Sequence, residues 1–249
     1  MMLSKNLIKY VRQLEQKKYR LREGVFVAEG PKVVGDLLRA GFQPRQLLAT
    51  SEWTPSQSLI TCQLSLITSD ELQKVSFLQH PQQVLGVFNL PQSSVEALPE
   101  GTLSLALDGV QDPGNLGTII RIADWFGITH IFCSPDTADA WNPKVVQATM
   151  GSIAHVSLTY TELAPLLSRT SMPVYGTLLD GKDIFRQELA TEGVIVMGNE
   201  GKGISAPIRQ LVTHPLLIPC FNQGQTAESL NVAIATAITC AEFRRRDIL

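Results

Sequence analysis

The chain has 249 residues, of which 44% are hydrophobic and 18% charged, a composition typical of globular proteins with one large domain or two small ones. Its formal net charge of −2 argues against a protein that coats nucleic acid indiscriminately. The four cysteines form no CxxC pair and the four histidines lack metal-ligand spacing, so we expect reduced thiols and no metal. The N-terminus has no apolar run of secretory length, which predicts a cytoplasmic protein outside the membrane.

Basic residues gather at the start of the chain. Residues 1–22 hold seven Lys and Arg side chains against Glu15 alone, a local charge of +6, so the other 227 residues carry −8. From Ser4, apolar residues recur at helical spacing between the cations, which predicts an amphipathic helix. This basic arm suits an anionic polymer, and a solvated helix face is the alternative interpretation.

The rest of the first half alternates strands with helices. Apolar runs between turn residues predict strands at 25–28, 46–49, 64–68 and 83–88. One helix is expected from Pro31 to a stop at Gly41, and another begins at Ser69 and Asp70. Residues 89–101 lose periodicity and gain Pro, Ser and Gly, which indicates a linker. We therefore predict a small α/β domain at 1–95 and a second domain at 96–249.

The second half begins with a uniformly apolar strand at 103–108, as expected for the centre of a parallel sheet. Further strands are predicted at 131–133, 156–158, 174–178, 194–197 and 216–218. Helices fit between them, including one at 118–126 and one opened by Asn142 and Pro143. Six strands alternating with helices predict an open, doubly wound α/β sheet whose ligands bind at the carboxyl ends of the strands.

The stretch 218–232 reads as a strand end, a polar turn and the start of a buried helix. Ser229 and Asn231 open that helix, and both residue types can cap it or hydrogen-bond a ligand. An ordinary N-cap is the simpler interpretation of these residues taken alone.

A glycine-rich loop, 198–203, follows the strand that ends at Met197. It matches neither the Walker A pattern nor the GxGxxG dinucleotide fingerprint, so a nucleoside-triphosphate site is disfavoured. Such a loop lets the backbone approach a flat ligand closely, and Glu200 places a charge within it. A plain tight turn is the alternative.

Asn115 and Arg121 lie six residues apart across a predicted helix start. Asn115 is a candidate cap, and Arg121 has Ile119, Ile120 and Ile122 as neighbours. Because burying an unpaired charge is costly, we expect Arg121 either to pair within the protein or to hold an anion.

Together, residues 108–121, 194–203 and 218–232 resemble the three motifs of the SpoU (TrmH) branch of the SPOUT superfamily, S-adenosyl-L-methionine-dependent RNA ribose 2′-O-methyltransferases. The resemblance covers roughly Leu103 to Arg244. The first half resembles the ribosomal-protein-like substrate-binding domain that many members carry, and residues 17–20 with 26–30 are typical of the rRNA-modifying members.

The resemblance implies a SPOUT α/β-knot, in which a parallel sheet with helices on both faces contains a deep trefoil knot. It implies S-adenosyl-L-methionine as cofactor, a homodimer, and RNA as partner, with rRNA favoured over tRNA. Cofactor binding is implied for Gly198, Ile218 and Leu230. A catalytic or substrate role is implied for Asn115, Arg121, Glu200, Ser229 and Asn231. Residues 220–228 depart from the commoner Pro-Met turn of the third motif.

Two other classes of protein are alternatives to an RNA methyltransferase. A doubly wound enzyme that acts on small molecules through a dinucleotide or nucleoside cofactor is disfavoured by the missing GxGxxG fingerprint and by the basic arm. A non-catalytic RNA-binding member of the fold is disfavoured because a pure binder needs none of Arg121, Glu200, Ser229 and Asn231.

Overall fold

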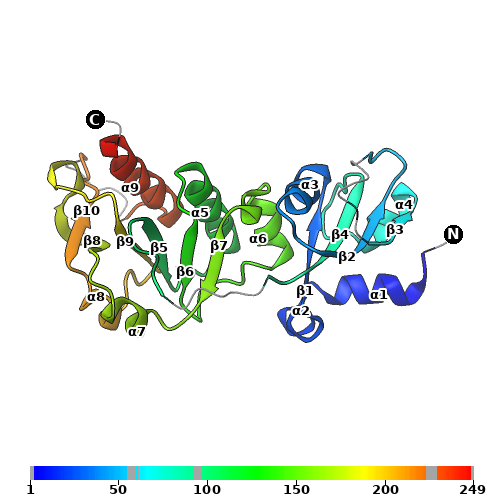
Figure 1. The fold of residues 1–249 in the computed structure, drawn as a ribbon, viewed down its shortest axis with the longest axis horizontal. Coiled ribbons are helices and arrows are strands. Elements are labelled where there is room, and N and C mark those ends of the chain that lie inside the picture. The colour runs from blue at the N-terminus through cyan, green and yellow to red at the C-terminus, as the bar shows by residue number, and fades with distance from the viewer. Residues whose placement is uncertain (1–2, 55–59, 61, 92–96, 223–228, 248–249) are drawn as a thin grey trace. The chain divides into compact units, whose positions relative to one another are not determined.

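The computed structural model describes residues 3–54, 60, 62–91, 97–222 and 229–247 (Figure 1). The chain forms two compact units. Unit 1 consists of Met1–Gln92 and Asp139–His155, and unit 2 of Ser93–Ala138 and Val156–Leu249. The predicted boundary after residue 95 lies outside the described residues and stays a prediction. The segment Asp139–His155 belongs to unit 1 although it lies within the second half of the chain.

Unit 1 is built on a four-stranded mixed sheet in the order β1-β4-β2-β3. The strands are β1 (Val25–Glu29), β2 (Pro44–Ala49), β3 (Leu64–Leu66) and β4 (Val84–Asn89). Both β1 and β2 pair antiparallel with β4, and β3 pairs parallel with β2. These strands lie close to the predicted ones because each apolar run is bounded by turn residues.

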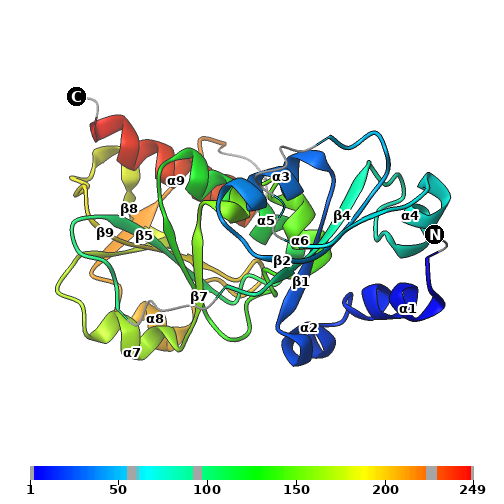
Figure 2. The same ribbon diagram turned by 45° about the vertical axis from the view of Figure 1, so that its right-hand side comes forward.

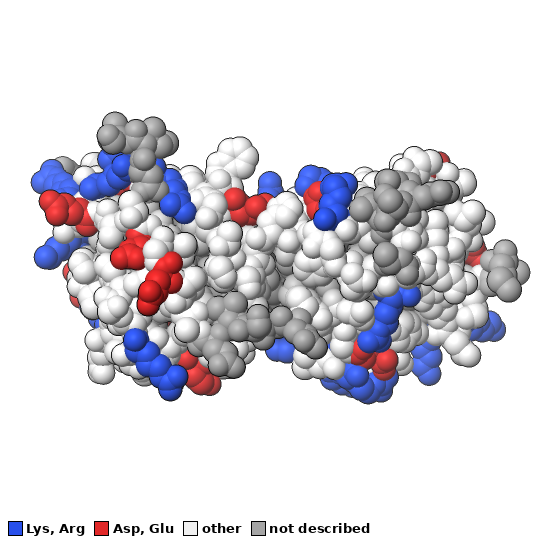
Figure 3. Space-filling view, in the orientation of Figure 1, with Lys and Arg blue, Asp and Glu red and all other residues white. Residues whose placement is uncertain are grey.

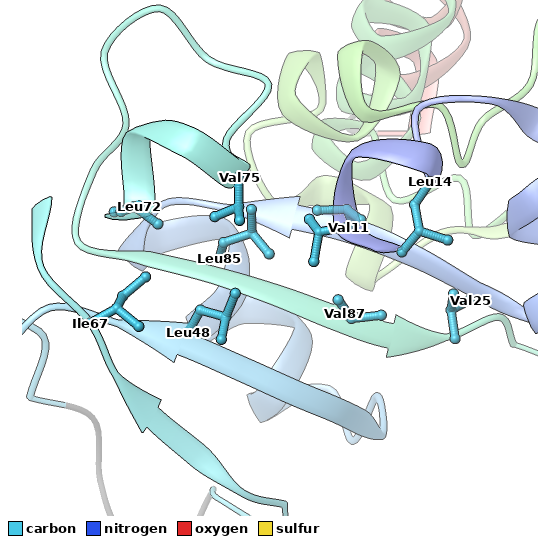
Figure 4. Close-up of a cluster of buried hydrophobic side chains, with 10 residues drawn as sticks. Val11, Leu14, Val25, Leu48, Ile67, Leu72, Val75, Leu85 and Val87 are labelled. Carbon is cyan, nitrogen blue, oxygen red and sulfur yellow. The ribbon is translucent and has the colours of Figure 1, made fainter. Parts of the chain in front are cut away.

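The apolar stripes of two helices cover this sheet on one side. Val11 of α1 (Lys5–Gln13) and Leu72 of α4 (Ser69–Val75) are buried in one cluster with Val25, Leu48 and Val87 of the strands (Figure 4). A capping box formed by Thr68 and Glu71 begins α4. The predicted basic arm continues beyond α1 into a second helix, α2 (Lys17–Glu23).

The described residues of unit 1 include three further helical segments: α3 (Pro31–Arg39), α6 (Pro143–Ala148) and the short 3-10 helix η2 (Ser152–Ala154). The helix α3 packs against β1 and β4, and α6 packs against β1. Aromatic contacts join these parts, since the ring of Phe26 lies 5.7 Å from that of Phe88 and 4.7 Å from that of Trp141, measured between centroids.

Unit 2 holds a six-stranded sheet in the order β10-β8-β9-β5-β6-β7, and every pairing in it is parallel. The strands are β5 (Leu103–Asp108), β6 (His130–Cys133), β7 (Ser157–Tyr160), β8 (Val174–Asp183), β9 (Gly193–Gly198) and β10 (His214–Leu217). The chain runs from β5 through β6 to β7 on one side and returns to β8 on the other, so the strand order reverses beside β5. Crevices at such a reversal are where open α/β sheets bind ligands.

Helices cover both faces of this sheet (Figure 1, Figure 2). On one face, α7 (Leu163–Ser168) and α8 (Ala206–Arg209) bury Leu163, Leu167 and Ile208 with Ala106 and Val196 of the strands. On the other, α5 (Pro113–Trp125) packs along α9 (Val232–Asp247). A short 3-10 helix, η3 (Ile184–Arg186), follows β8.

The predicted parallel sheet with helices on both faces is therefore confirmed, together with the small α/β unit of the first half. The trefoil knot stays a prediction. Among the helices of the described residues, none combines the length and the apolar character that crossing a bilayer requires.

Candidate active site

Loops that leave the carboxyl ends of β5 and β9 are joined by hydrogen bonds. The two strands are neighbours, with Asp108 paired to Gly198 at their ends. The Asp108 carboxylate accepts a hydrogen bond from the Ser205 amide at 2.6 Å, and the Asn199 side chain donates to the Gly109 carbonyl at 2.7 Å. The first and second sequence motifs therefore form one structure, although about ninety residues separate them.

The loop after β9 is a closed turn that requires glycine. The amides and carbonyls of Asn199 and Gly203 bond to each other at 3.0 and 2.9 Å. The Asn199 side-chain oxygen accepts from the amides of Gly201 and Lys202, each at 3.0 Å. A Cβ atom on Gly198 would lie 2.3 Å from the Gly203 carbonyl carbon, so only glycine fits there. The loop is thus tightly turned, and its glycine at 198 is required for the turn to close on itself.

Glu200 lies at the tip of this turn and connects it to the first motif. Its carboxylate accepts hydrogen bonds from the amides of Gln111 and Asp112, both at 3.2 Å, and from the Asn115 side chain at 3.0 Å. Partial burial alone raises the pKa of the Glu200 carboxyl, but the bonds from Asn115 and the backbone outweigh it, so the pKa lies below its usual value. Glu200 is therefore held as a carboxylate that orders two loops.

The predicted capping role of Asn115 is wrong. The helix α5 begins earlier than expected, at Pro113, and its N-cap is Asp112, whose carboxylate accepts from the Asn115 amide at 2.7 Å. Proline at the first helical position and aspartate before it form a standard helix start, which the glycine-rich sequence concealed. The Asn115 side chain is consequently free to bond Glu200 on one side and Asn231 on the other.

Asn231 connects the third motif to the other two. Its side-chain amide donates to the Asn115 side-chain oxygen at 2.9 Å, while its own oxygen accepts from the amides of Ala233 and Ile234 at 2.9 and 3.3 Å. Asn231 is therefore the cap of α9, as predicted, and also a link between motifs. Ser229 lies one residue before Leu230 and does not cap the helix. The predicted atypical turn lies mainly at residues 223–228, outside the described residues.

The helices α5 and α9 are held together at both ends. Near their first turns Asn231 bonds Asn115, and near their last turns Arg244 donates to the Phe126 carbonyl at 2.8 Å. The two helices therefore run side by side in the same direction, and both direct their N-termini toward the loops of the site. Protein side chains already accept hydrogen bonds from amides of these first turns, Asp112 on α5 and Asn231 on α9.

The prediction that Arg121 lies in an apolar environment is wrong. Ile119, Ile120 and Ala123 of α5 are buried, but Arg121 lies on the exposed side of that helix. Among the described residues it makes no ion pair and no side-chain hydrogen bond, so the alternative of a structural pair finds no support. An exposed guanidinium without a protein partner retains its capacity for bidentate binding of a phosphate.

A cavity of about 580 Å³ opens beside the turn after β9. All three predicted cofactor residues, Gly198, Ile218 and Leu230, line it, as do Glu200 and Ser229. Asn115, Arg121 and Asn231 do not line it, and they lie on the α5 and α9 side of the network. The structure thus divides the predicted residues into a group around a cavity and a group outside it.

The cavity also has a wall that sequence reasoning missed. The second half of β8 contributes Thr177, Leu178, Leu179 and Asp180, and an ion pair joins Asp180 to Arg209 of α8 at the rim. The signal that could have identified this wall was its position, because these residues directly follow the part of β8 that pairs with β9, in a parallel sheet whose strand ends bind ligands. Neither its residue types nor their spacing indicated a role.

Two of the four cysteines, Cys133 and Cys240, are buried. Burial raises the pKa of Cys133 and of Cys240 to about 12, so neither thiol is a nucleophile at neutral pH. No group of three or more His, Cys, Asp and Glu side chains that could hold a metal ion occurs in the described part of the chain.

Comparison with known proteins agrees with this geometry. Residues 102–241 match the SpoU rRNA Methylase family, and residues 5–86 match the MRM3-like substrate binding domain. The chain is 32% identical to the 23S rRNA (guanosine(2553)-2'-O)-methyltransferase of Bacillus subtilis, over 95% of each protein.

Solved structures give the same result. A TrmH-family protein of Porphyromonas gingivalis superposes with a TM-score of 0.88 and 43% identity, covering 99% of this chain and 100% of the other. An rRNA methyltransferase of Sinorhizobium meliloti with bound AdoMet superposes with a TM-score of 0.84 and 31% identity, covering 99% and 97%. The family match spans more than half of the chain and includes every residue of the network and the cavity. This chain belongs to the SpoU rRNA methylase family.

Proposed function

We propose that this chain transfers the methyl group of S-adenosyl-L-methionine to a ribose 2′-hydroxyl of RNA, with 23S rRNA as its substrate. The observation that carries the proposal is the cavity of about 580 Å³ at the carboxyl ends of the strands, placed beside the Asn115, Glu200 and Asn231 network. The Bacillus relative acts on 23S rRNA by name, and the Sinorhizobium relative was solved with the cofactor bound.

The residues around the cavity fit an S-adenosyl-L-methionine molecule. The volume lies within the range of small-molecule sites, about 300–1,000 Å³. Ile218 and Leu230 supply apolar surface for an adenine ring, and Gly198 lies in the wall of the cavity, where its missing side chain lets the turn after β9 close. When bound there, the cofactor supplies an activated methyl group on a positively charged sulfur. The task of the chain is then to place the 2′-oxygen in line and to help its proton leave.

The residues outside the cavity suit the RNA. We assign Arg121 to an RNA phosphate, because its guanidinium is exposed and lacks a partner among the described residues. Guanidinium is a donor and a poor base, so its contribution is to orient the nucleotide and to stabilise the developing alkoxide. Ser229, at the cavity wall, is placed to hold the ribose. Glu200, Asn115 and Asn231 fix the three loops with respect to one another.

We further propose that the enzyme works as a homodimer through an apolar surface that includes Trp125 of α5 and Ile234 of α9. Trp125 of α5 is 85% exposed and Ile234 of α9 is 51% exposed, and a second copy of the chain would remove both from water. Sedimentation of the wild type and of Trp125→Lys tests this. The wild type is expected to sediment as a dimer and the variant as a monomer, and a monomeric wild type would contradict it. The predicted cytoplasmic location stays a prediction.

The methylation proposal is tested with the purified protein and tritiated S-adenosyl-L-methionine. We expect filter-retained cofactor without RNA, and transfer of label to unmodified 23S rRNA but not to tRNA. Digestion of the product should release the label as a 2′-O-methyl nucleoside. Transfer of label to tRNA would contradict 23S rRNA as the substrate and assign tRNA in its place. Cofactor binding without transfer to any RNA would favour a non-catalytic member of the fold.

A further inference from the structure

Four of the seven cations of the N-terminal arm fall into two groups that the sequence does not separate. Arg20 is 1% exposed, donates to the Leu14 carbonyl at 2.7 Å and forms an ion pair with Asp139. Arg12 donates to the Ser76 carbonyl, and its guanidinium lies 5.1 Å from the centroid of a phenylalanine ring. Both arginines support the fold of unit 1, and burial makes Arg20 unavailable to a ligand, whereas Arg12 is exposed. The hypothesis that the whole arm grips RNA is therefore wrong for Arg20.

The second group lies on α2 and faces solvent. Lys18 and Arg22 are exposed, and their charged ends lie 4.9 and 5.0 Å from the centroid of the Tyr19 ring. Leu21, between them in sequence, is 63% exposed. Arg45 of β2 is exposed as well, and its guanidinium lies near Gly24 at the end of α2. Figure 3 shows blue side chains gathered over the place that α2 occupies in Figure 1. We call Lys18, Tyr19, Arg22 and Arg45 the α2 surface.

Tyr19 gives this surface an order that scattered lysines lack. A cation over an aromatic face is worth about 0.5–1 kcal/mol at an exposed site. The ring therefore restrains two long side chains that otherwise lose about 2 kcal/mol of rotamer freedom each when a ligand orders them. Arg22 also pairs with Glu23 at 2.9 Å, but exposed pairs contribute about 0–1 kcal/mol, so a phosphate can replace that carboxylate.

We infer that the α2 surface binds the sugar-phosphate backbone of the RNA substrate, an inference that rests on the proposed function. The cavity has room for a cofactor and cannot hold a large RNA, so the substrate requires contact surfaces elsewhere on the chain. Residues 1–22 carry a local charge of +6 on a chain of net −2, and the exposed Lys18 and Arg22 of α2 lie within that segment. Two adjacent cations restrained on one ring suit successive phosphates better than the dispersed carboxylates of an acidic protein.

The test is RNA binding by Lys18→Gln/Arg22→Gln over a series of KCl concentrations, followed by fluorescence anisotropy of a labelled 23S rRNA fragment. Two phosphate contacts contribute about 0.7–0.9 each to the slope of log Kd against log salt, so the slope should fall by about 1.4–1.8. The KM for RNA should rise with kcat unchanged. A second variant, Tyr19→Leu, should weaken binding while it retains the wild-type slope, because it removes restraint and no charge.

Lys74→Gln/Arg169→Gln is the matched control, since it removes two exposed charges elsewhere on the chain. It should bind RNA like the wild type. An unchanged slope in the α2 variant, or an equal fall in the control, would overturn the inference. Binding of polyglutamate with the same affinity and slope would assign the surface to acidic proteins and overturn it too. Methyl transfer by the wild type is measured first. If the wild type transfers no methyl group, the proposed function itself is rejected. If the wild type is active but the α2 variant has an unchanged slope, only the RNA-binding role of the α2 surface is rejected.

Discussion

Replacement of Arg121 separates a catalytic role from a structural one. Its side chain lies on the exposed side of α5 and has no partner among the described residues, so its removal strands no buried charge. Lys and Ala both have helix propensities close to that of Arg. We therefore expect Arg121→Lys and Arg121→Ala to change the free energy of unfolding by no more than about 0.5 kcal/mol, as at ordinary surface positions.

The expected effect on the reaction is much larger. Lysine keeps the charge but loses the planar, bidentate contact with phosphate, so methyl transfer should fall about 100-fold or more. That factor corresponds to about 2.7 kcal/mol of lost transition-state stabilisation. Cofactor affinity should not change, because Arg121 does not line the cavity.

The assay is single-turnover transfer with enzyme in excess and cofactor saturating, combined with chemical unfolding and calorimetric cofactor binding for each variant. Arg169→Lys, at an exposed position after α7, is the matched control and should transfer at the wild-type rate. If the Arg121 variants lose stability and their activity falls only in proportion, Arg121 supports the fold and the assignment is wrong.

Three other changes test the site and unit 1. Leu230→Asp should abolish cofactor binding in calorimetry with an unchanged melting temperature, because it puts a charge into the apolar wall, and binding like the wild type would exclude Leu230 from the site. Arg20→Ala should destabilise the protein by about 3–5 kcal/mol in chemical unfolding, since it leaves Asp139 unpaired, and full stability would contradict the structural role. The stabilisation from Glu200, whose folded pKa is lowered, is present above pH about 4.3 and lost as the pH falls through the folded value. The melting temperatures of wild type and Glu200→Gln should therefore converge in acid, and a constant difference between them would count against an ionised Glu200.

The alternation of strands and helices was readable from the sequence because each element carries its own periodicity. The strand β5 was located from its apolar run, and the turn after β9 from its glycines. The predicted membership of the SpoU branch is confirmed. The order of the strands was not readable, since the position of β9 between β8 and β5 depends on which surfaces pack best. The same holds for the segment Asp139–His155. The residues on either side of it in sequence belong to unit 2, and only the packing of the folded chain shows that the segment belongs to unit 1.

Errors within the site arose from single side chains. The exposure of Arg121 follows from helix geometry, because Thr118, Arg121 and Trp125 share a side opposite Ile119 and Ile120, whereas its neighbours in sequence alone suggested an apolar environment. Partners distant in sequence could not be predicted by any local rule. Asn231 bonds a residue 116 positions earlier, and that bond connects the three motifs.

The central claim is that this chain methylates a ribose 2′-hydroxyl of rRNA. It is tested most directly by mapping 2′-O-methyl sites across all rRNA and tRNA of a strain that lacks the gene. In the deletion strain we expect the loss of ribose methylation in 23S rRNA, with every methylated site in tRNA retained. A wild-type copy of the gene should restore the lost methylation. An unchanged set of methylated riboses in the deletion strain would contradict it.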